Sequence, residues 1–195
     1  MKKLIITTVL FVTASFAMAD DISLGVPGYG GTGCPAGTVS ATLSPDSKEL
    51  SLLFDSYQVE AGGTSGRVID RKSCNVAIPV HIPQGMSVSV LSVDYRGYNF
   101  LPQNAKSIFN VEYFFAGSRG PSFTKTYMGP IDNNFFIVNP LTVSALVWSP
   151  CGADVNLRTN SSLRVESRTA QAIATVDSAD VSAAIIYHLQ WRACQ

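Results

Sequence analysis

Apolar residues recur at every second position in several stretches of the 195-residue chain, most clearly between Arg71 and Tyr98. In the first half of this stretch the alternating apolar residues are Cys74, Val76, Ile78, Val80 and Ile82. Successive side chains of a strand point to opposite faces, so a period of two predicts a strand with one buried face. Beyond the first residues of the chain no segment has a convincing helical period of 3.6. The sequence therefore favours an all-β fold.

A turn and a change of phase follow this strand. Pro83 has a preset φ and Gly85 is free to take a positive φ, so we expect the chain to reverse here and form a hairpin. In the returning arm the apolar phase slips by one residue between Val90 and Leu91. An uncorrected slip would turn half of the strand inside out. The sequence therefore predicts a β-bulge near Val90 and Leu91.

Other segments show the same strand pattern with turn residues between them. A second hairpin is expected from Thr38–Leu43 and Leu50–Tyr57. Val155–Val165 fits either one long strand or a hairpin about Asn160. Further strands are expected at Ile108–Phe115, Phe123–Met128, Asn134–Val138 and Thr142–Trp148. About ten short strands predict a single-domain antiparallel β-sandwich.

The last segment alternates most regularly of all. One face is expected to carry Val181, Ala183, Ile185, Tyr187, Leu189 and Trp191. The other face is expected to carry Ser182, Ala184, Ile186, His188, Gln190 and Arg192. The first of these faces is the one we expect in the core.

The N-terminus has the three parts of a secretory signal peptide. Lys2 and Lys3 form a basic region, Leu4–Val12 is apolar, and Ala17-Met18-Ala19 is a small-x-small cleavage site. We therefore expect a leader at 1–19 and a secreted domain at 20–195, in the periplasm or outside the cell. The short Lys-Lys start indicates a bacterial protein. The apolar run is too short for a membrane span, and no other stretch reaches 18 apolar residues.

The charge of the mature chain argues against nucleic acid as a partner. Loss of Lys2 and Lys3 lowers the basic count from 14 to 12 against 14 acidic residues, a net charge of about −2. Charged residues make up 14% of the chain, well below the usual level of about 25%. Ser, Thr and Asn are expected to solvate the surface instead.

All four cysteines lie in the mature chain. An even number in an oxidising compartment favours two disulfides, and no pair has the close spacing of a zinc site. Of the three possible pairings we favour Cys34–Cys74 and Cys151–Cys194, since each closes a loop that is local in sequence. We expect no metal and no cofactor.

Six short motifs resemble a family of small secreted four-cysteine proteins that is catalogued as a domain of unknown function. They are Gly31-Thr32-Gly33-Cys34-Pro35, Arg71-Lys72-x-Cys74, Pro83-Gln84-Gly85, Asp94-Tyr95-Arg96-Gly97-Tyr98, Ser149-Pro150-Cys151-Gly152 and Trp191-Arg192-x-Cys194. The resemblance covers nearly the whole mature chain. It implies secretion, the four cysteines and a β-rich domain, and it brings no activity, cofactor or catalytic residue.

A GxGxxG pattern at Gly28–Gly33 matches a dinucleotide fingerprint only in its letters. A dinucleotide site needs a strand before these glycines and a helix after them, whereas Cys34-Pro35 follows here. We interpret the segment as a flexible glycine loop held by the first disulfide.

The best candidate for a binding site is the group Asp94, Tyr95, Arg96 and Tyr98. Tyrosine rings stack on sugars or apolar groups, and an arginine offers a planar fork of donors, so a small ligand-binding patch is possible here. The competing interpretation is that Asp94 and Arg96 fasten a strand end while the tyrosines cover the core.

Residues for catalysis are less distinctive. His81 and His188 fall in the polar phase of their strands and lack metal-binding spacing, which favours surface histidines. A Ser-His-Asp triad is compatible with the sequence, because its members need not be adjacent. Asp94 and Glu112 could form a glycosidase pair, since that chemistry needs two carboxylates about 5–10 Å apart.

These observations leave three function classes. The first is a secreted, non-enzymatic binding or structural module for a carbohydrate or surface polymer or a protein. The second is a small secreted hydrolase that uses carboxylates. The third is a protease inhibitor or toxin, for which the disulfide-braced segment from Gly25 to Cys34 would be the contact loop. The sequence alone selects no activity.

Overall fold

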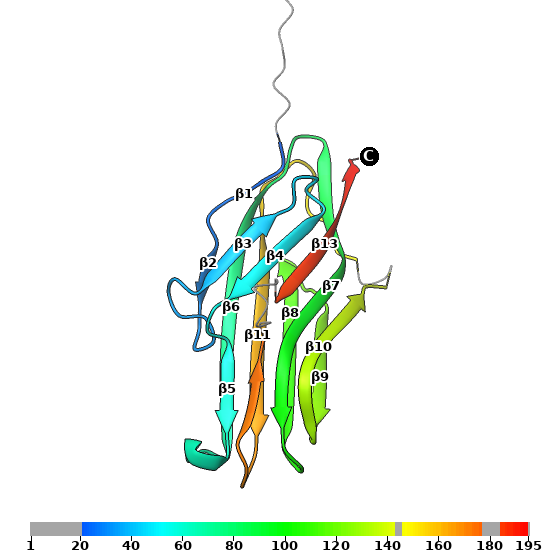
Figure 1. Ribbon diagram of the computed structural model, residues 1–195. Coiled ribbons are helices and arrows are strands. Elements are labelled where there is room, and N and C mark those ends of the chain that lie inside the picture. The colour runs from blue at the N-terminus through cyan, green and yellow to red at the C-terminus, as the bar shows by residue number, and fades with distance from the viewer. Residues whose placement is uncertain (1–20, 143–145, 177–183, 195) are drawn as a thin grey trace, which may run out of the picture.

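The computed structural model describes residues 21–142, 146–176 and 184–194, which form two antiparallel β-sheets packed face to face (Figure 1). The predicted leader at 1–19 lies outside the described residues. All strand pairs are antiparallel, so the predicted antiparallel β-sandwich is confirmed. No helix among the described residues is long and apolar enough to cross a membrane.

The first sheet, here called sheet A, has two long strands at its centre. In order across the sheet, its strands are β1 (Ser23–Leu24) and β2 (Gly28–Gly30), both on β6 (Ile69–His81), then β11 (Val155–Glu166), β8 (Lys106–Phe115) and β9 (Ser122–Met128). β11 is one continuous strand, which decides between the two interpretations of Val155–Val165.

The second sheet, sheet B, is organised around the sixteen-residue strand β7 (Met86–Leu101). Its strands are β3 (Val39–Leu43), β4 (Glu49–Phe54), β13 (Ile185–Ala193), β7, β12 (Ala172–Thr175) and β5 (Gln58–Ala61), with β10 (Ile131–Pro140) on the free side of β7. A short 3₁₀ turn, η1 (Gly63–Ser65), follows β5. The predicted β3–β4 hairpin is confirmed.

The predicted β-bulge on β7 is also confirmed. His188 of β13 pairs with Ser92, but the next residue, Leu189, pairs with Val90, so Leu91 is left without a counterpart. Leu91 is 40% exposed, whereas Val90 is buried. Because one residue is absorbed here, the apolar residues on both sides of the bulge face the core.

The predicted hairpin between the two arms of residues 71–98 is wrong. The turn itself forms, since Met86 N–H donates to Pro83 O at 3.1 Å and Gly85 has a φ of 80°. However, β6 belongs to sheet A and β7 to sheet B, so the turn connects the two layers. Both strands have one apolar face, and placing one strand above the other brings these faces into contact, which side-by-side pairing would not do.

Two further expectations need correction. Thr142–Trp148 forms no strand in its described part; Trp148 makes one isolated bridge, to Ser89. The ladder of β10 ends at Pro140, opposite Ser92, and Leu141 N–H donates to Leu91 O at the bulge, at 2.9 Å. Val181, Ser182 and Ala183 lie outside the described residues. In the rest of the last segment, Ala184 is buried although its phase predicted the outer face.

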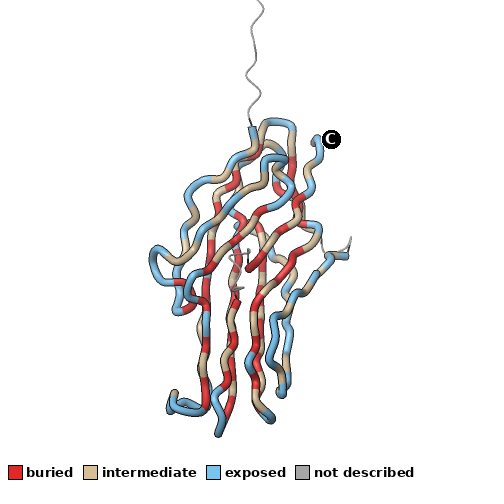
Figure 2. Tube along the Cα trace, in the orientation of Figure 1, coloured by how far each residue is buried: buried red, intermediate tan, exposed pale blue. Residues whose placement is uncertain are grey.

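The core lies between the two sheets, where most inward residues of β4, β6, β7, β8, β11 and β13 are buried (Figure 2). Aromatic rings join the layers: Tyr95 of β7 meets Phe109 of β8 edge-on at 5.3 Å, and Tyr113 of β8 meets Tyr187 of β13 at 5.9 Å. Buried hydroxyl groups also meet across the layers, since Tyr187 Oη pairs with Thr159 Oγ1. This pairing lets the Tyr187 ring fill the core while its hydroxyl keeps a hydrogen-bond partner.

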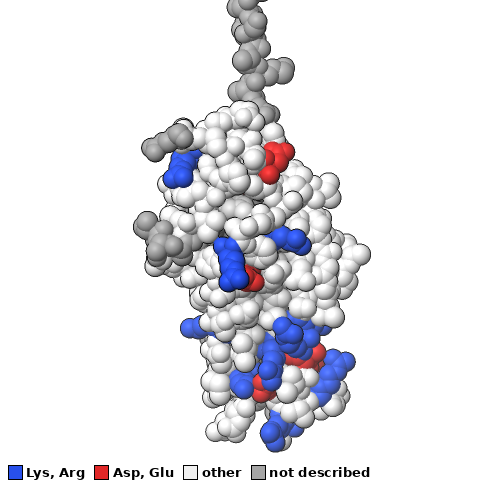
Figure 3. All heavy atoms as spheres, turned by 180° about the vertical axis from the view of Figure 1, so that it is seen from behind, with Lys and Arg blue, Asp and Glu red and all other residues white. Residues whose placement is uncertain are grey.

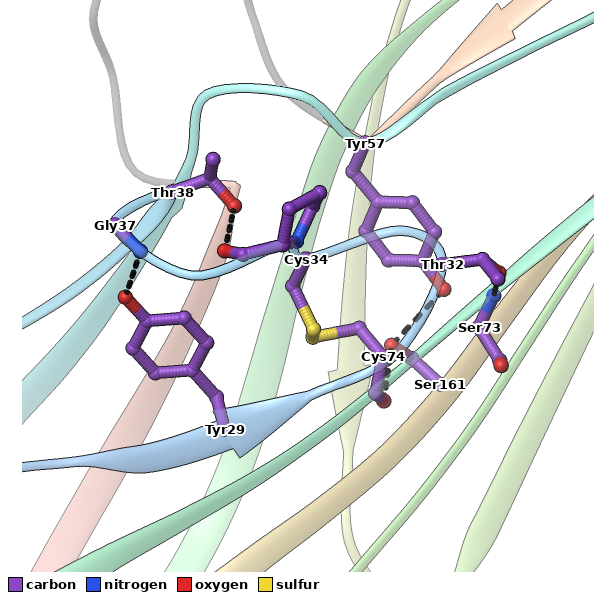
Figure 4. The surroundings of a disulfide bond; sticks show 10 residues. Tyr29, Thr32, Cys34, Gly37, Thr38, Tyr57, Ser73, Cys74 and Ser161 are labelled. Atoms are coloured by element: carbon purple, nitrogen blue, oxygen red, sulfur yellow. Dashed lines mark hydrogen bonds between the residues drawn. A yellow bond between two sulfur atoms is a disulfide. The ribbon is translucent and has the colours of Figure 1, made fainter.

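Both predicted disulfides are present, Cys34–Cys74 and Cys151–Cys194, with Cα–Cα distances of 5.4 and 5.9 Å. Figure 4 shows that the first bridge holds the glycine-rich segment against β6. Gly33 N–H donates to Ser73 O at 2.8 Å, and Ser73 N–H donates to Thr32 Oγ1 at 3.1 Å. The expected attachment of this segment by the first disulfide is confirmed, and its residues 28–30 form strand β2 rather than loop.

Glycine is needed at Gly31 for a close approach. Its φ is 142°, and a Cβ there would lie 2.2 Å from Ser73 O. Residues 28–30 pair with β6 as strand β2, and the next element is strand β3, so the GxGxxG pattern lacks the helix that a dinucleotide site needs. Because β1 and β2 both lie along β6, the segment from Gly25 to Cys34 does not protrude as an inhibitory loop would.

The two faces of β13 can be separated by mutation. Leu189→Ala removes a side chain that is 6% exposed, and we expect a loss of about 2–5 kcal/mol in the free energy of unfolding. Gln190→Ala alters an exposed side chain, so the change should stay within about 0.5 kcal/mol. Denaturant unfolding of the two variants measures both values. Equal losses would contradict the assignment of faces.

The buried tyrosines make stability depend on alkaline pH. Burial raises the pKa of Tyr57 to about 12 and also raises the pKa of Tyr187. The folded state therefore keeps the neutral phenol, whereas the unfolded chain ionises near about pH 10. This contribution is complete below about pH 10 and is lost as the pH rises towards the folded pKa. Denaturant unfolding at a series of pH values should show the loss, and Tyr57→Phe should reduce it; a flat profile would contradict it.

Candidate functional site

The sequence-predicted site lies in the second half of β7, at the centre of sheet B. Val93 and Tyr95 face the core, so Asp94, Arg96 and Tyr98 point to the opposite, outer face. Their outward direction depends on the bulge at Leu91, because the extra residue decides which of the later residues of β7 point outward. β13 flanks Asp94 on one side, and β10 flanks all three residues on the other.

Tyr95 does not belong to this surface. Its side chain is fully buried, stacks on Phe123 at a centroid distance of 5.1 Å, and touches Phe109. Burial raises the pKa of its phenol. The strand pleat explains the difference, because neighbouring residues of a strand cannot share a face. Three of the four predicted contact residues therefore remain together.

The partner strand β10 contributes an aromatic ring that the sequence analysis missed. Phe136 lies opposite Arg96 in register, and the Arg96 guanidinium carbon is 5.0 Å from the centre of the Phe136 ring. Phe136 is 57% exposed, and Val138, opposite Asp94, is 56% exposed. The sequence did contain a sign of this exposed ring, the unbroken apolar run from Phe135 to Val138. A strand whose apolar residues do not alternate has apolar side chains on both faces, so one of them is exposed when the strand lies at a sheet edge.

Tyr98 is held in place by a neighbour on the same strand pair. Its hydroxyl donates to Asp132 Oδ1 at 2.7 Å, and this hydrogen bond to the neutral phenol raises the pKa of Tyr98. We call Arg96, Tyr98, Phe136 and Val138 the aromatic platform. It combines two exposed apolar side chains, a cation and a phenol on one sheet face.

Beside the platform, His188 lies between two carboxylates. Its Nε2 is 3.0 Å from Asp94 Oδ2, and its Nδ1 is 3.5 Å from Glu49 Oε1. Asp94 is 8% exposed, and its second oxygen, Oδ1, has no hydrogen-bond partner in the described part of the chain. Both imidazole nitrogens face carboxylates, so His188 does not stand between an acid and a serine as in a Ser-His-Asp triad.

The remaining candidates for chemistry are dispersed. His81 lies on sheet A, where its Nδ1 is 2.8 Å from Asp154 Oδ1. Glu112 points outward from sheet A, whereas Asp94 points outward from sheet B, so the core separates the two carboxylates. They cannot flank one glycosidic bond, and the predicted hydrolase pair is wrong. Among the described residues no three His, Cys, Asp or Glu side chains form a metal-binding group.

The aromatic platform is an open sheet face. Hollows of about 540, 400 and 220 Å³ lie elsewhere on the described surface, and none of their lining residues belongs to the platform. An open face that combines an exposed aromatic ring with a cation and a phenol can contact an extended partner.

Comparison with known proteins places the chain in a family. The model of the domain of unknown function DUF4360 matches residues 20–194. An "Uncharacterized secreted protein" of Arthroderma benhamiae is 39% identical over 169 residues, which covers 85% of this chain and 69% of that protein. The chain belongs to the DUF4360 family. This confirms the predicted resemblance.

The comparison also bears on the source and location of the protein. The relative is fungal, so the expectation of a bacterial protein has no support from it. The relative is called secreted, and both cysteine pairs of this DUF4360 member are oxidised, which agrees with an extracellular protein. A periplasmic location gains no support.

The opposite directions of Tyr95 and Tyr98 give a test of the site. Tyr95→Ala should lower the free energy of unfolding by about 3–5 kcal/mol, because it empties part of the core. Tyr98→Ala should change it by no more than about 1 kcal/mol, since only a surface contact is lost. Chemical denaturation of both variants provides the comparison. A large loss at Tyr98 would show that its face is covered.

Proposed function

We propose that this protein is a secreted, non-enzymatic binding module that recognises a carbohydrate or surface polymer through the aromatic platform. In this proposal residues 1–19 are a cleaved leader and 20–195 form one domain. The observation that carries it is the exposure of Phe136 beside Arg96 and Tyr98. An exposed aromatic ring on a sheet is costly to leave in water, and a partner that covers it regains that free energy.

The chemistry of the platform suits a sugar ring. The C–H face of a sugar can stack on Phe136 and Val138, while the Arg96 fork donates hydrogen bonds to its hydroxyl groups. Asp132, which accepts from Tyr98, offers a second oxygen to a ligand hydroxyl. All of these groups lie on two paired strands, so little conformational entropy is lost when a ligand binds.

Glycan-array screening of the mature protein, followed by calorimetry with the best ligand, tests this proposal. Phe136→Ala should weaken binding on the order of tenfold or more, because a central aromatic contact is worth about 2 kcal/mol when it is covered. The variant should remain folded, since Phe136 is more than half exposed.

Phe114→Ala is the matched control, because Phe114 points outward from sheet A and the chemical change is the same. It should leave glycan binding unchanged. Equal losses in both variants, or no glycan binding at all, would contradict the proposal. A parallel protease panel tests the inhibitor class, and inhibition of a protease would replace the carbohydrate proposal.

A further inference from the structure

We propose that the protein has a second binding site, for an acidic polysaccharide, at the end of sheet A that carries η1. This end lies opposite the end where β13 runs to the C-terminus (Figure 1). A hollow of about 540 Å³ opens there. It lies on the other sheet from the aromatic platform, and the inference does not depend on the platform's function.

Apolar side chains line this hollow. Val68, Ile69 and Met128 are 51%, 48% and 59% exposed, and all three belong to its lining. The pleat of β6 turns Ile69 outward, because Cys74, Val76 and Ile78 define the inward phase. In register across sheet A, Ile69 pairs with Glu166, and Lys106 pairs with Met128. Because Glu166 also pairs with Lys106, the four residues form one row across the sheet, with the apolar side chains of Ile69 and Met128 at its two ends.

Cations surround the apolar residues. Lys106 and Arg168 line the hollow, and the next row along the strands places Arg71 directly opposite Arg164. Figure 3 shows Lys and Arg side chains gathered at this end of sheet A. Like charges directly opposite each other destabilise a sheet, so the Arg71–Arg164 pair has a cost that an anionic ligand would offset.

The local charge is clearly positive. Glu166 contacts both Lys106, at 3.1 Å, and Arg164, and Asp70 pairs with Arg67 at 3.4 Å. Four cations remain at this end of sheet A: Lys106, Arg164, Arg168 and Arg71. The negative charge of Glu166 offsets one of them, so the net local charge is about +3. The mature chain as a whole carries more acidic than basic residues, so this charge is concentrated at one place.

The remaining lining groups favour a sugar. Gln103, Asn104 and Thr169 add amide and hydroxyl groups that donate and accept hydrogen bonds. Arginine forks recognise carboxylate and sulfate groups, and the apolar residues can contact the C–H face of a sugar ring. A membrane-inserting surface would present its apolar side chains on a projecting tip, whereas here they line a hollow with polar groups. The observations therefore favour an acidic polysaccharide over a membrane.

The walls of the hollow are tied together before any ligand binds. Ser167 N–H donates to Val68 O at 3.0 Å, and Gly129 N–H donates to Ala105 O at 2.9 Å. A row of small polar residues, Ser73, Ser162, Asn110 and Thr124, continues up sheet A beyond the arginine pair. A polymer chain can thus extend from the hollow along the sheet face.

Calorimetric titration of the mature protein with polygalacturonate, a carboxylate polymer, tests the inference. Binding is expected with polygalacturonate and absent with neutral dextran of similar length, and it should weaken as salt is added. Arg71→Gln combined with Arg168→Gln should weaken binding by on the order of tenfold or more, because charge-assisted hydrogen bonds to the carboxylates of the ligand are lost. Both side chains are exposed, so the thermal midpoint should hardly change.

Lys48→Gln combined with Arg119→Gln is the control, because it removes the same charge from exposed sites outside the hollow. It should leave polygalacturonate binding unchanged, as should Phe136→Ala. Met128→Asp is a second variant, which places a carboxylate in the hollow and should also weaken binding. Equal losses in the control, no binding to polygalacturonate, or binding only to phosphatidylserine vesicles would overturn the inference.

Discussion

The β-bulge at Leu91 is the local feature on which sheet B depends. β7 pairs with β13, β12 and β10, so the alternation of inward and outward residues along β7 also fixes which residues of these three strands face inward. Without the extra residue, either Val88 and Val90 or Val93 and Tyr95 would face the solvent. The bulge allows one long strand to keep an apolar face towards sheet A over its whole length. It also fixes the outward direction of Asp94, Arg96 and Tyr98.

Tyrosine has two roles in this fold, and the strand pleat separates them. Inward tyrosines fill the core, and two of them bond across the layers through their hydroxyls: Tyr57 with Ser161 at 3.1 Å and Tyr187 with Thr159. Outward Tyr98 has the same chemistry but bonds a surface carboxylate. A group of aromatic residues in the sequence is therefore divided between stability and recognition at alternate positions.

The two sheets present chemically different outer faces. Sheet B combines exposed Phe136 and Val138 with Arg96, and it places His188 between two carboxylates. Sheet A carries small polar residues over its middle and a concentration of cations at one end. Both faces belong to the one sandwich, and the DUF4360 family model covers residues 20–194 of the chain. A secreted binding module with two contact faces is consistent with this organisation.

Local patterns in the sequence determined most of the long strands, the bulge, the disulfide pairing and the inward face of β13 from Ile185 to Leu189, because each depends on alternation or on nearby residues. The same patterns placed Asp94, Arg96 and Tyr98 together but misplaced Tyr95, which shares their segment and not their face. Only the tertiary structure decided that β6 and β7 belong to different sheets, since a turn sequence does not specify whether its arms pair or stack. Phe136 and the hollow at Met128 also required the fold. They depend on pairing between strands that are not neighbours in the sequence, β7 with β10 and β6 with β11, and no local pattern encodes that register.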